Sequence, residues 1–183
     1  KTKYSENAGL LALRQAIARY LARTEGLSYD PASQIVVTPG AMGALFLALK
    51  VLLNPGDEVI VNEPCWTNYI QQIRMCGGVP VSVKTDAQRG FDLDVSAVAE
   101  TITSKTKAII LNSPCNPTGA VASAETLSQL AKLAQERDLV VLADEVYKHI
   151  LFDGRTYTGF ATLPGMKERT LVIDSLSKTY AMT

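Results

Sequence analysis

The sequence predicts an α/β fold, a three-layer α-β-α sandwich built around a mostly parallel β-sheet. Three observations point to it. Short apolar or β-branched runs recur along the 183 residues, segments with helical spacing separate most of them, and Gly or Pro turns stand at the junctions. Strands that alternate with helices in this way form βαβ units, whose strands lie parallel in one sheet.

Helices are expected where apolar residues recur at intervals of three and four. The stretch 10–24 shows this spacing and stops at Gly26. Ser123 has the chemistry of an N-cap for the amphipathic segment that follows it. The predicted helices are 10–24, 41–53, 67–76, 95–102 and 123–137.

Strands are expected at the short apolar or β-branched runs between these helices. Pro80 indicates that its run is an edge strand or the start of a strand, because proline cannot donate to a ladder. The run 139–143 is almost wholly apolar, which predicts that the sheet is covered on both faces there. The predicted strands are 34–38, 58–61, 79–83, 108–112, 139–143 and 170–173.

The composition excludes several classes of protein. Lysine plus arginine and aspartate plus glutamate both number 18, and 47% of residues are hydrophobic. A disordered chain needs lower hydrophobicity and a high net charge. A balanced charge offers no electrostatic footprint for nucleic acid or for an anionic membrane, so neither partner is expected. No apolar run reaches the roughly 18 residues of a membrane span.

The cysteines and the first residues of the chain bear on the cellular compartment of the protein. Three cysteines are scattered without CxxC spacing, and His149 is the single histidine, so neither a metal site nor a disulfide framework is expected. Residues 1–7 are polar and do not resemble a signal peptide. We therefore expect reduced thiols and a cytoplasmic protein. The chain reads as a segment of a longer one, because it begins without Met and ends at Thr183 without a capping signal.

Ligands of parallel sheets bind beyond the carboxyl ends of the strands, so the residues that follow each strand are the candidates for chemistry. Residues 40–43, which include Gly40, Ala41 and Gly43, open a helix, where free N–H groups can bind an anion; by themselves they are a weak signal and are also explained by a plain tight turn. In the loop 112–119 two prolines restrict the backbone and hold Asn116 in place, although the loop is also explained as an elaborate turn.

Three further side chains have two explanations each. Asp144 ends a buried strand and could hold a cationic ring nitrogen, with Tyr147 adding a phenol, or it could simply cap a helix. Lys178 could be a nucleophilic amine in a partly desolvated cleft, or a solvated surface lysine. Trp66 could stack on a planar ring or pack in the core.

The order of these pieces resembles the class I/II aminotransferase family of fold type I pyridoxal-phosphate enzymes. The resemblance covers essentially the whole chain and implies that residues 1–183 form a cofactor-binding large domain of the pyridoxal-phosphate-dependent transferase type. The small C-terminal domain would lie outside the chain. The matching residues are Tyr4, Gly9, Leu13, Arg14, PGAMGAL at 39–45, NPGDE at 54–58, PCW at 64–66, NPTG at 116–119, DEVY at 144–147 and SLSK at 175–178.

The resemblance implies roles around the ring of pyridoxal 5'-phosphate. Lys178 is similar to the lysine that forms a Schiff base with the cofactor and later moves the proton. Asp144 resembles the partner of the ring nitrogen and keeps it protonated, so that the ring acts as an electron sink. Tyr147 and Asn116 resemble the pair that hydrogen-bonds the ring oxygen, and Trp66 the aromatic residue stacked over the ring.

It also implies a phosphate site. Gly40 and the backbone N–H groups of Ala41 and Met42, with the Ser175 hydroxyl, resemble the phosphate ligands. Tyr4 resembles the tyrosine that reaches the phosphate of a neighbouring subunit, which implies a homodimer with shared active sites. Two positions depart from the family: Cys65 stands where an aromatic residue is frequent, and Met42 where a small or polar one is.

The implied activity is transfer of an amino group between an L-amino acid and a 2-oxo acid. The family's second phosphate-binding arginine and its substrate-carboxylate arginine would lie beyond residue 183, so the segment alone is expected to be inactive. A lyase that cleaves C–S or other β-substituents on the same fold, or a regulatory module that senses the cofactor, remains an alternative. The identity of the amino acid stays open.

Overall fold

The computed structural model describes residue 4 and residues 6–183, which form five parallel strands and the helices around them. The strand order is β2-β1-β3-β4-β5, so β2 lies at an edge, as Pro80 predicted. The strands are β1 (Glu58–Glu63), β2 (Val79–Lys84), β3 (Thr106–Asn112), β4 (Val140–Asp144) and β5 (Thr170–Ile173). The α-helices are α1 (Leu11–Glu25), α2 (Gly40–Leu52), α3 (Asn68–Met75), α4 (Val95–Thr101), α5 (Ala124–Glu136) and α6 (Leu176–Thr179). Three 3₁₀ turns, η1 (Ala87–Arg89), η2 (Phe160–Thr162) and η3 (Lys167–Arg169), complete the described elements.

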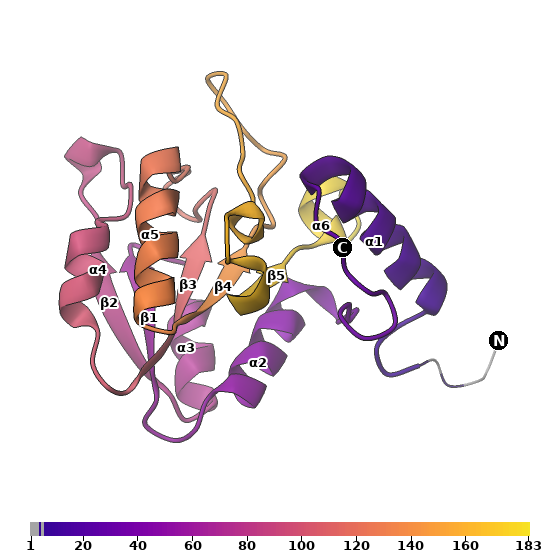
Figure 1. Cartoon of the computed structure of the whole chain (residues 1–183), viewed down its shortest axis with the longest axis horizontal. Helices are drawn as coiled ribbons and strands as arrows, with labels where there is room; N and C mark the ends of the chain where they lie inside the picture. The colour runs from indigo at the N-terminus through magenta and orange to yellow at the C-terminus, as the bar shows by residue number, and fades with distance from the viewer. Residues whose placement is uncertain (1–3, 5) are drawn as a thin grey trace.

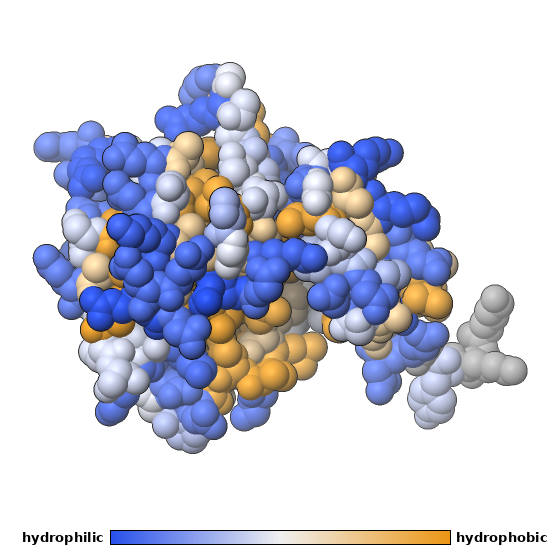
Figure 2. All heavy atoms as spheres, viewed as in Figure 1, coloured by the Kyte–Doolittle hydropathy of each residue, from blue (hydrophilic) through white to orange (hydrophobic). Residues whose placement is uncertain are grey.

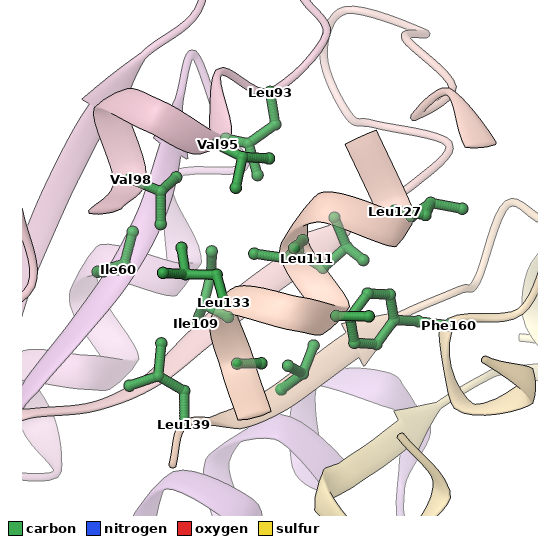
Figure 3. Packing of buried hydrophobic residues seen from close by; sticks show 14 of the residues in the cluster. Ile60, Leu93, Val95, Val98, Ile109, Leu111, Leu127, Leu133, Leu139 and Phe160 are labelled. Carbon is green, nitrogen blue, oxygen red and sulfur yellow. The ribbon is translucent and has the colours of Figure 1, made fainter. Parts of the chain in front are cut away.

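Helices cover both faces of the sheet and confirm the three-layer arrangement (Figure 1). On one face α4 and α5 pack against side chains such as Ile109 and Val141, in a cluster that also holds Phe160 (Figure 3). On the other face α2 and α3 cover the alternate side chains of the same strands, including Ile110 and Leu142. Alternate residues of β3 and β4 are therefore buried on opposite faces, which explains why these strands are nearly continuous apolar runs.

A third, smaller cluster attaches α1 beyond the β5 edge. Leu21 of α1 and Leu27 pack with Ala161 of η2, and Val172 of β5 lies against them. Gly26 ends α1 in the left-handed conformation, with φ of 70°, as glycine after a helix commonly does. The edge strand β5 is thereby flanked by the N-terminal part of the chain (Figure 1).

The predicted strand at 34–38 is wrong. This segment runs without a ladder partner among the described residues, and one backbone bond, from the Val37 N–H to the Ala8 carbonyl at 2.9 Å, fixes it to the N-terminal segment. β-branched residues favour extended backbone, but a strand also needs a paired neighbour. The other five strands and all five predicted helices are present, and no boundary differs by more than two residues. Within the described residues, no helix is both long enough and apolar enough to span a membrane.

Candidate active site

Asp144 is the last residue of β4, and its side chain is buried at the carboxyl edge of the sheet. The Tyr69 hydroxyl, from α3, donates to Asp144 Oδ2 at 2.5 Å. Burial raises the pKa of Asp144 above its ordinary value, the Tyr69 hydrogen bond opposes this, and the charge of Asp174 adds to it. Asp144 ends β4 and precedes a non-helical turn, so the explanation as a helix cap does not hold.

An asparagine pair brings the loop after β3 to the same edge. Asn112 donates from Nδ2 to the Asp144 carbonyl at 3.0 Å, and its Oδ1 accepts the Asn116 N–H at 2.8 Å. The Asn116 amide in turn lies 3.5 Å from the Tyr147 hydroxyl. Asn116 and Tyr147, to which the family resemblance gives one ring oxygen as a shared partner, therefore lie together, and each is partly exposed.

Lys178 stands on α6, directly after β5. Its Nζ atom lies 5.9 Å from the centre of the Tyr147 ring, which places the amine beside the Asn116–Tyr147 pair. Lys178 is exposed in this chain, so the desolvation expected for a nucleophilic amine is not supplied by the described residues. Ser175 begins α6 as its N-cap, because its Oγ accepts the Ser177 N–H at 3.1 Å, which leaves the hydroxyl proton free to donate.

The start of α2 forms an open cup of backbone N–H groups. Gly40 has φ of 73°, a Cβ built there would meet nothing within 4 Å, and no side chain of the described residues caps the helix. Uncapped N–H groups with the positive end of a helix dipole attract anions. Gln72 of α3 donates to the Met42 carbonyl at 3.3 Å, so the helix that carries Tyr69 also braces the start of α2.

Trp66 and Tyr4 occupy different surroundings. Trp66 and Tyr69 make an edge-to-face contact, with 5.4 Å between ring centroids, and Trp66 stays partly exposed, so it packs against the hydrogen-bond partner of Asp144. Tyr4 is fully exposed. An exposed tyrosine in the N-terminal segment is free to contact another subunit.

Sequence reasoning missed Tyr69 and a buried set of charges. Nothing in the spacing indicated that a tyrosine 75 positions before Asp144 would be its hydrogen-bond partner. Lys148 and Glu145, in the turn after β4, are both buried, although charged residues in turns are usually exposed. Their burial depends on α1 and the 157–160 segment, which come from distant parts of the chain.

The fold and this constellation correspond to one known class of protein. The chain belongs to the family described as "Aminotransferase class I and II", which matches residues 1–183. This family uses pyridoxal phosphate.

Individual relatives agree with that assignment. The protein YugH of Bacillus subtilis (strain 168) is 47% identical over 182 residues, which is 100% of this chain and 47% of the relative. Aspartate aminotransferase of Pyrococcus abyssi is 41% identical over the same shares. The crystal structure of an aromatic aminotransferase from Pyrococcus horikoshii OT3 has a TM-score of 0.96 and 42% identity, covering 100% of this chain and 48% of that one. The chain thus spans about half the length of the curated relatives it matches.

Proposed function

We propose that residues 1–183 are the cofactor-binding large domain of a pyridoxal-phosphate-dependent aminotransferase. The whole protein would transfer an amino group between an L-amino acid and a 2-oxo acid. One observation carries the proposal: the buried Asp144 carboxyl, the Asn116–Tyr147 pair and the Lys178 amine meet at the carboxyl ends of β3, β4 and β5. Parallel sheets bind their ligands at this edge.

The residues present fit pyridoxal phosphate at both of its ends. Asp144 is a buried carboxyl whose pKa burial raises, and a cationic ring nitrogen would supply the positive partner that such a group needs. The open start of α2, with no side chain around Gly40, suits a phosphate dianion bound by the N–H groups of Ala41 and Met42. The Ser175 hydroxyl could donate to the same phosphate.

When bound, the cofactor supplies an aldehyde that condenses with amines and a ring that accepts an electron pair. The protein's own groups would then act on protons. Asp144 would hold a proton on the ring nitrogen, because a carboxylate stabilises the charged form of its neighbour. Lys178 would hold the cofactor through its Nζ atom, and the same amine, when free, would take up and return a proton within the site. Tyr147 and Asn116 would donate to the ring oxygen, and Trp66 would cover a ring face.

The proposal extends to assembly and location. A homodimer is supported by the full exposure of Tyr4 and by apolar side chains of α2, such as Leu47 and Val51, that face outward. Figure 2 shows apolar surface gathered over α2. A cytoplasmic location is supported by the three free cysteines, since thiols persist in a reducing compartment.

The test is to locate the covalent bond. The complete polypeptide that contains this chain is incubated with pyridoxal phosphate, reduced with borohydride, digested and mapped by mass spectrometry. The added mass should lie on the peptide that contains Lys178; an adduct elsewhere, or none, would overturn the proposal.

Product analysis with amino donors separates the activities. A new amino acid together with a 2-oxo acid indicates transfer, whereas ammonia with pyruvate indicates a lyase. Cofactor binding without turnover of any donor would favour a sensor over an enzyme.

A further inference from the structure

A buried lysine next to the candidate site has no part in the roles assigned above. Lys148 follows Tyr147 in the turn after β4, and its side chain is 1% exposed. Its Nζ atom lies 2.8 Å from Glu25 Oε1, at the end of α1, and 2.7 Å from Asp174 Oδ2, directly after β5. The ammonium also faces the Tyr20 ring of α1, 5.6 Å from its centre.

Asp174 carries this contact to the residues that would hold the cofactor. While Oδ2 receives the Lys148 ammonium, Oδ1 accepts the Ser175 N–H at 2.7 Å. Ser175 in turn caps the helix that bears Lys178. Three consecutive contacts therefore connect a fully buried cation to the start of a four-residue helix, which is too short to hold its own direction.

The same turn touches α6 a second time. Tyr147, the residue before Lys148, places its ring 5.9 Å from Lys178 Nζ. Adjacent residues thus engage both ends of the segment that carries Ser175 and Lys178. α1, drawn beside α6 in Figure 1, supplies the second carboxylate through Glu25.

We propose that Lys148 is a positioning residue: through Asp174 it sets the placement of Ser175 and Lys178 relative to Tyr147 and Asn116. This inference rests on the proposed function, because it concerns how that site is aligned. Burial by itself lowers the pKa of Lys148, but the two carboxylates, Asp174 foremost, raise it above the ordinary value, so the link is charged in the working pH range. A charge-assisted hydrogen bond such as the one between Lys148 and Asp174 is short and directional, so it can hold Asp174 in one position.

The alternative is that the cluster only holds α1 onto the domain. Removing the two contacts of Lys148 one at a time distinguishes these explanations. Asp174→Asn removes the charge that faces the site but leaves the pair with Glu25, whereas Glu25→Gln does the reverse. Arg169→Met is the matched control for loss of a cation, since Arg169 binds the Ala134 and Leu139 carbonyls at the opposite end of the sheet.

The experiment uses the complete polypeptide and three measurements. These are the dissociation constant for pyridoxal phosphate, the acylation rate of Lys178 in cofactor-free protein by competitive labelling and mass spectrometry, and the melting temperature. We expect Lys148→Met and Asp174→Asn each to weaken cofactor binding about tenfold or more, because a misplacement near 1 Å is costly in a preorganised site. Both should also change the labelling rate of Lys178. The double variant should bind the cofactor no more weakly than either single variant, because both substitutions remove the same contact between Lys148 and Asp174.

Glu25→Gln and Arg169→Met should lower the melting temperature and leave the dissociation constant within about twofold, because neither change removes the contact between Lys148 and Asp174. Equal losses of cofactor binding in Glu25→Gln and Asp174→Asn, or unchanged binding and labelling in Lys148→Met, would overturn the inference. Should Lys148→Met fail to fold, Asp174→Asn and Lys148→Arg, which keeps the charge, decide the question. Wild-type protein that does not bind pyridoxal phosphate would refute the proposed function, whereas normal binding in every variant refutes only this inference.

Discussion

The two ends of strand β4 differ in chemistry. Its amino end follows Leu139, which is buried among apolar side chains of α5 and β3. Its carboxyl end leads into Asp144, Glu145 and Lys148, three buried charged residues within five positions. Burying a carboxyl or an ammonium opposes folding unless partners compensate, whereas burying leucine favours it. The strand is thus stabilised at one end by apolar burial and leads at the other end into buried charges that need partners.

The largest effect expected from this division is at Lys178. Lys178→Ala in the complete polypeptide should lower amino transfer by at least about 10⁴-fold, because the covalent attachment and the proton carrier are lost together. The side chain is exposed and away from the apolar core, so the melting temperature should stay nearly unchanged. Turnover with a good amino donor and a thermal melt test this. Activity near the wild-type level would show that another group carries the reaction.

Asp144→Asn should have the second largest effect. The amide keeps the shape of the side chain and can still accept from Tyr69, but it cannot hold a proton on a ring nitrogen. Transfer should fall by about 10²–10³-fold, as when one preorganised electrostatic contact is removed from an active site.

In Asp144→Asn, Lys178 should still be labelled by pyridoxal phosphate and borohydride. This result would distinguish the role of Asp144 from that of Lys178. Stability should not fall, because burial already disfavours the Asp144 carboxylate. An unchanged turnover in the Asn variant would contradict the role of Asp144.

A substitution in the apolar cluster around the amino half of β4 should lower stability and leave cofactor binding unchanged. Leu130 of α5 is fully buried in the cluster that covers the amino half of β4. Leu130→Ala should reduce the free energy of unfolding by about 2–5 kcal/mol through lost burial and the cavity left behind. Urea unfolding measures it. The dissociation constant for pyridoxal phosphate should hold near the wild-type value under conditions where the variant is folded; a large loss of affinity would show that the two regions are not independent.

Most of the fold followed from local patterns, and the errors have physical causes. The runs 58–61 and 139–143 became β1 and β4 because each is short, apolar and bounded by turns or helices. The run 34–38 has similar propensity but no ladder partner among the described residues, and pairing depends on the rest of the chain. Apart from the edge position of β2, strand order was likewise not predictable, since spacing within a segment does not specify its neighbour in the sheet.

The candidate site was predictable where a side chain's role depends on its place at a strand end. Asp144, Asn116 and Lys178 all lie at the predicted edge. Contacts between distant segments were not predictable: Tyr69 with Asp144, and Lys148 with Glu25, join residues 75 and 123 positions apart. The exposure of Lys178 also differs from the expected partly desolvated cleft, because no described segment covers it.

The smallest and most specific prediction concerns Glu145, the residue after Asp144. Glu145 is buried, with 2% of the residue exposed. Its Oε1 atom accepts the Phe160 N–H at 3.3 Å, and its Oε2 atom has no hydrogen-bond partner among the described residues. Burial raises the pKa of Glu145 from 4.5 to about 7, and the nearby Tyr157 hydroxyl and Lys148 charge only partly oppose it. The Tyr157 hydroxyl stands close to the carboxyl, but its geometry is not that of a hydrogen bond.

A folded-state pKa above the unfolded value means that the native protein binds the proton more tightly, so stability falls as pH rises from about 4.5 to 7 and levels off above. The size of this change is about 3 kcal/mol, an order-of-magnitude value from the shift of the pKa. Glu145→Gln removes the titration, so its free energy of unfolding should rise relative to wild type between pH 5 and pH 8 by that amount. Urea unfolding at several pH values measures the difference, with Glu100→Gln as a control at an exposed carboxyl in α4. Parallel pH profiles for Glu145→Gln and wild type would mean that the Glu145 carboxyl is already ionised at pH 5. The carboxyl end of β4 would then hold a compensated charge there, and the contrast with its amino end would be smaller than the buried residues indicate.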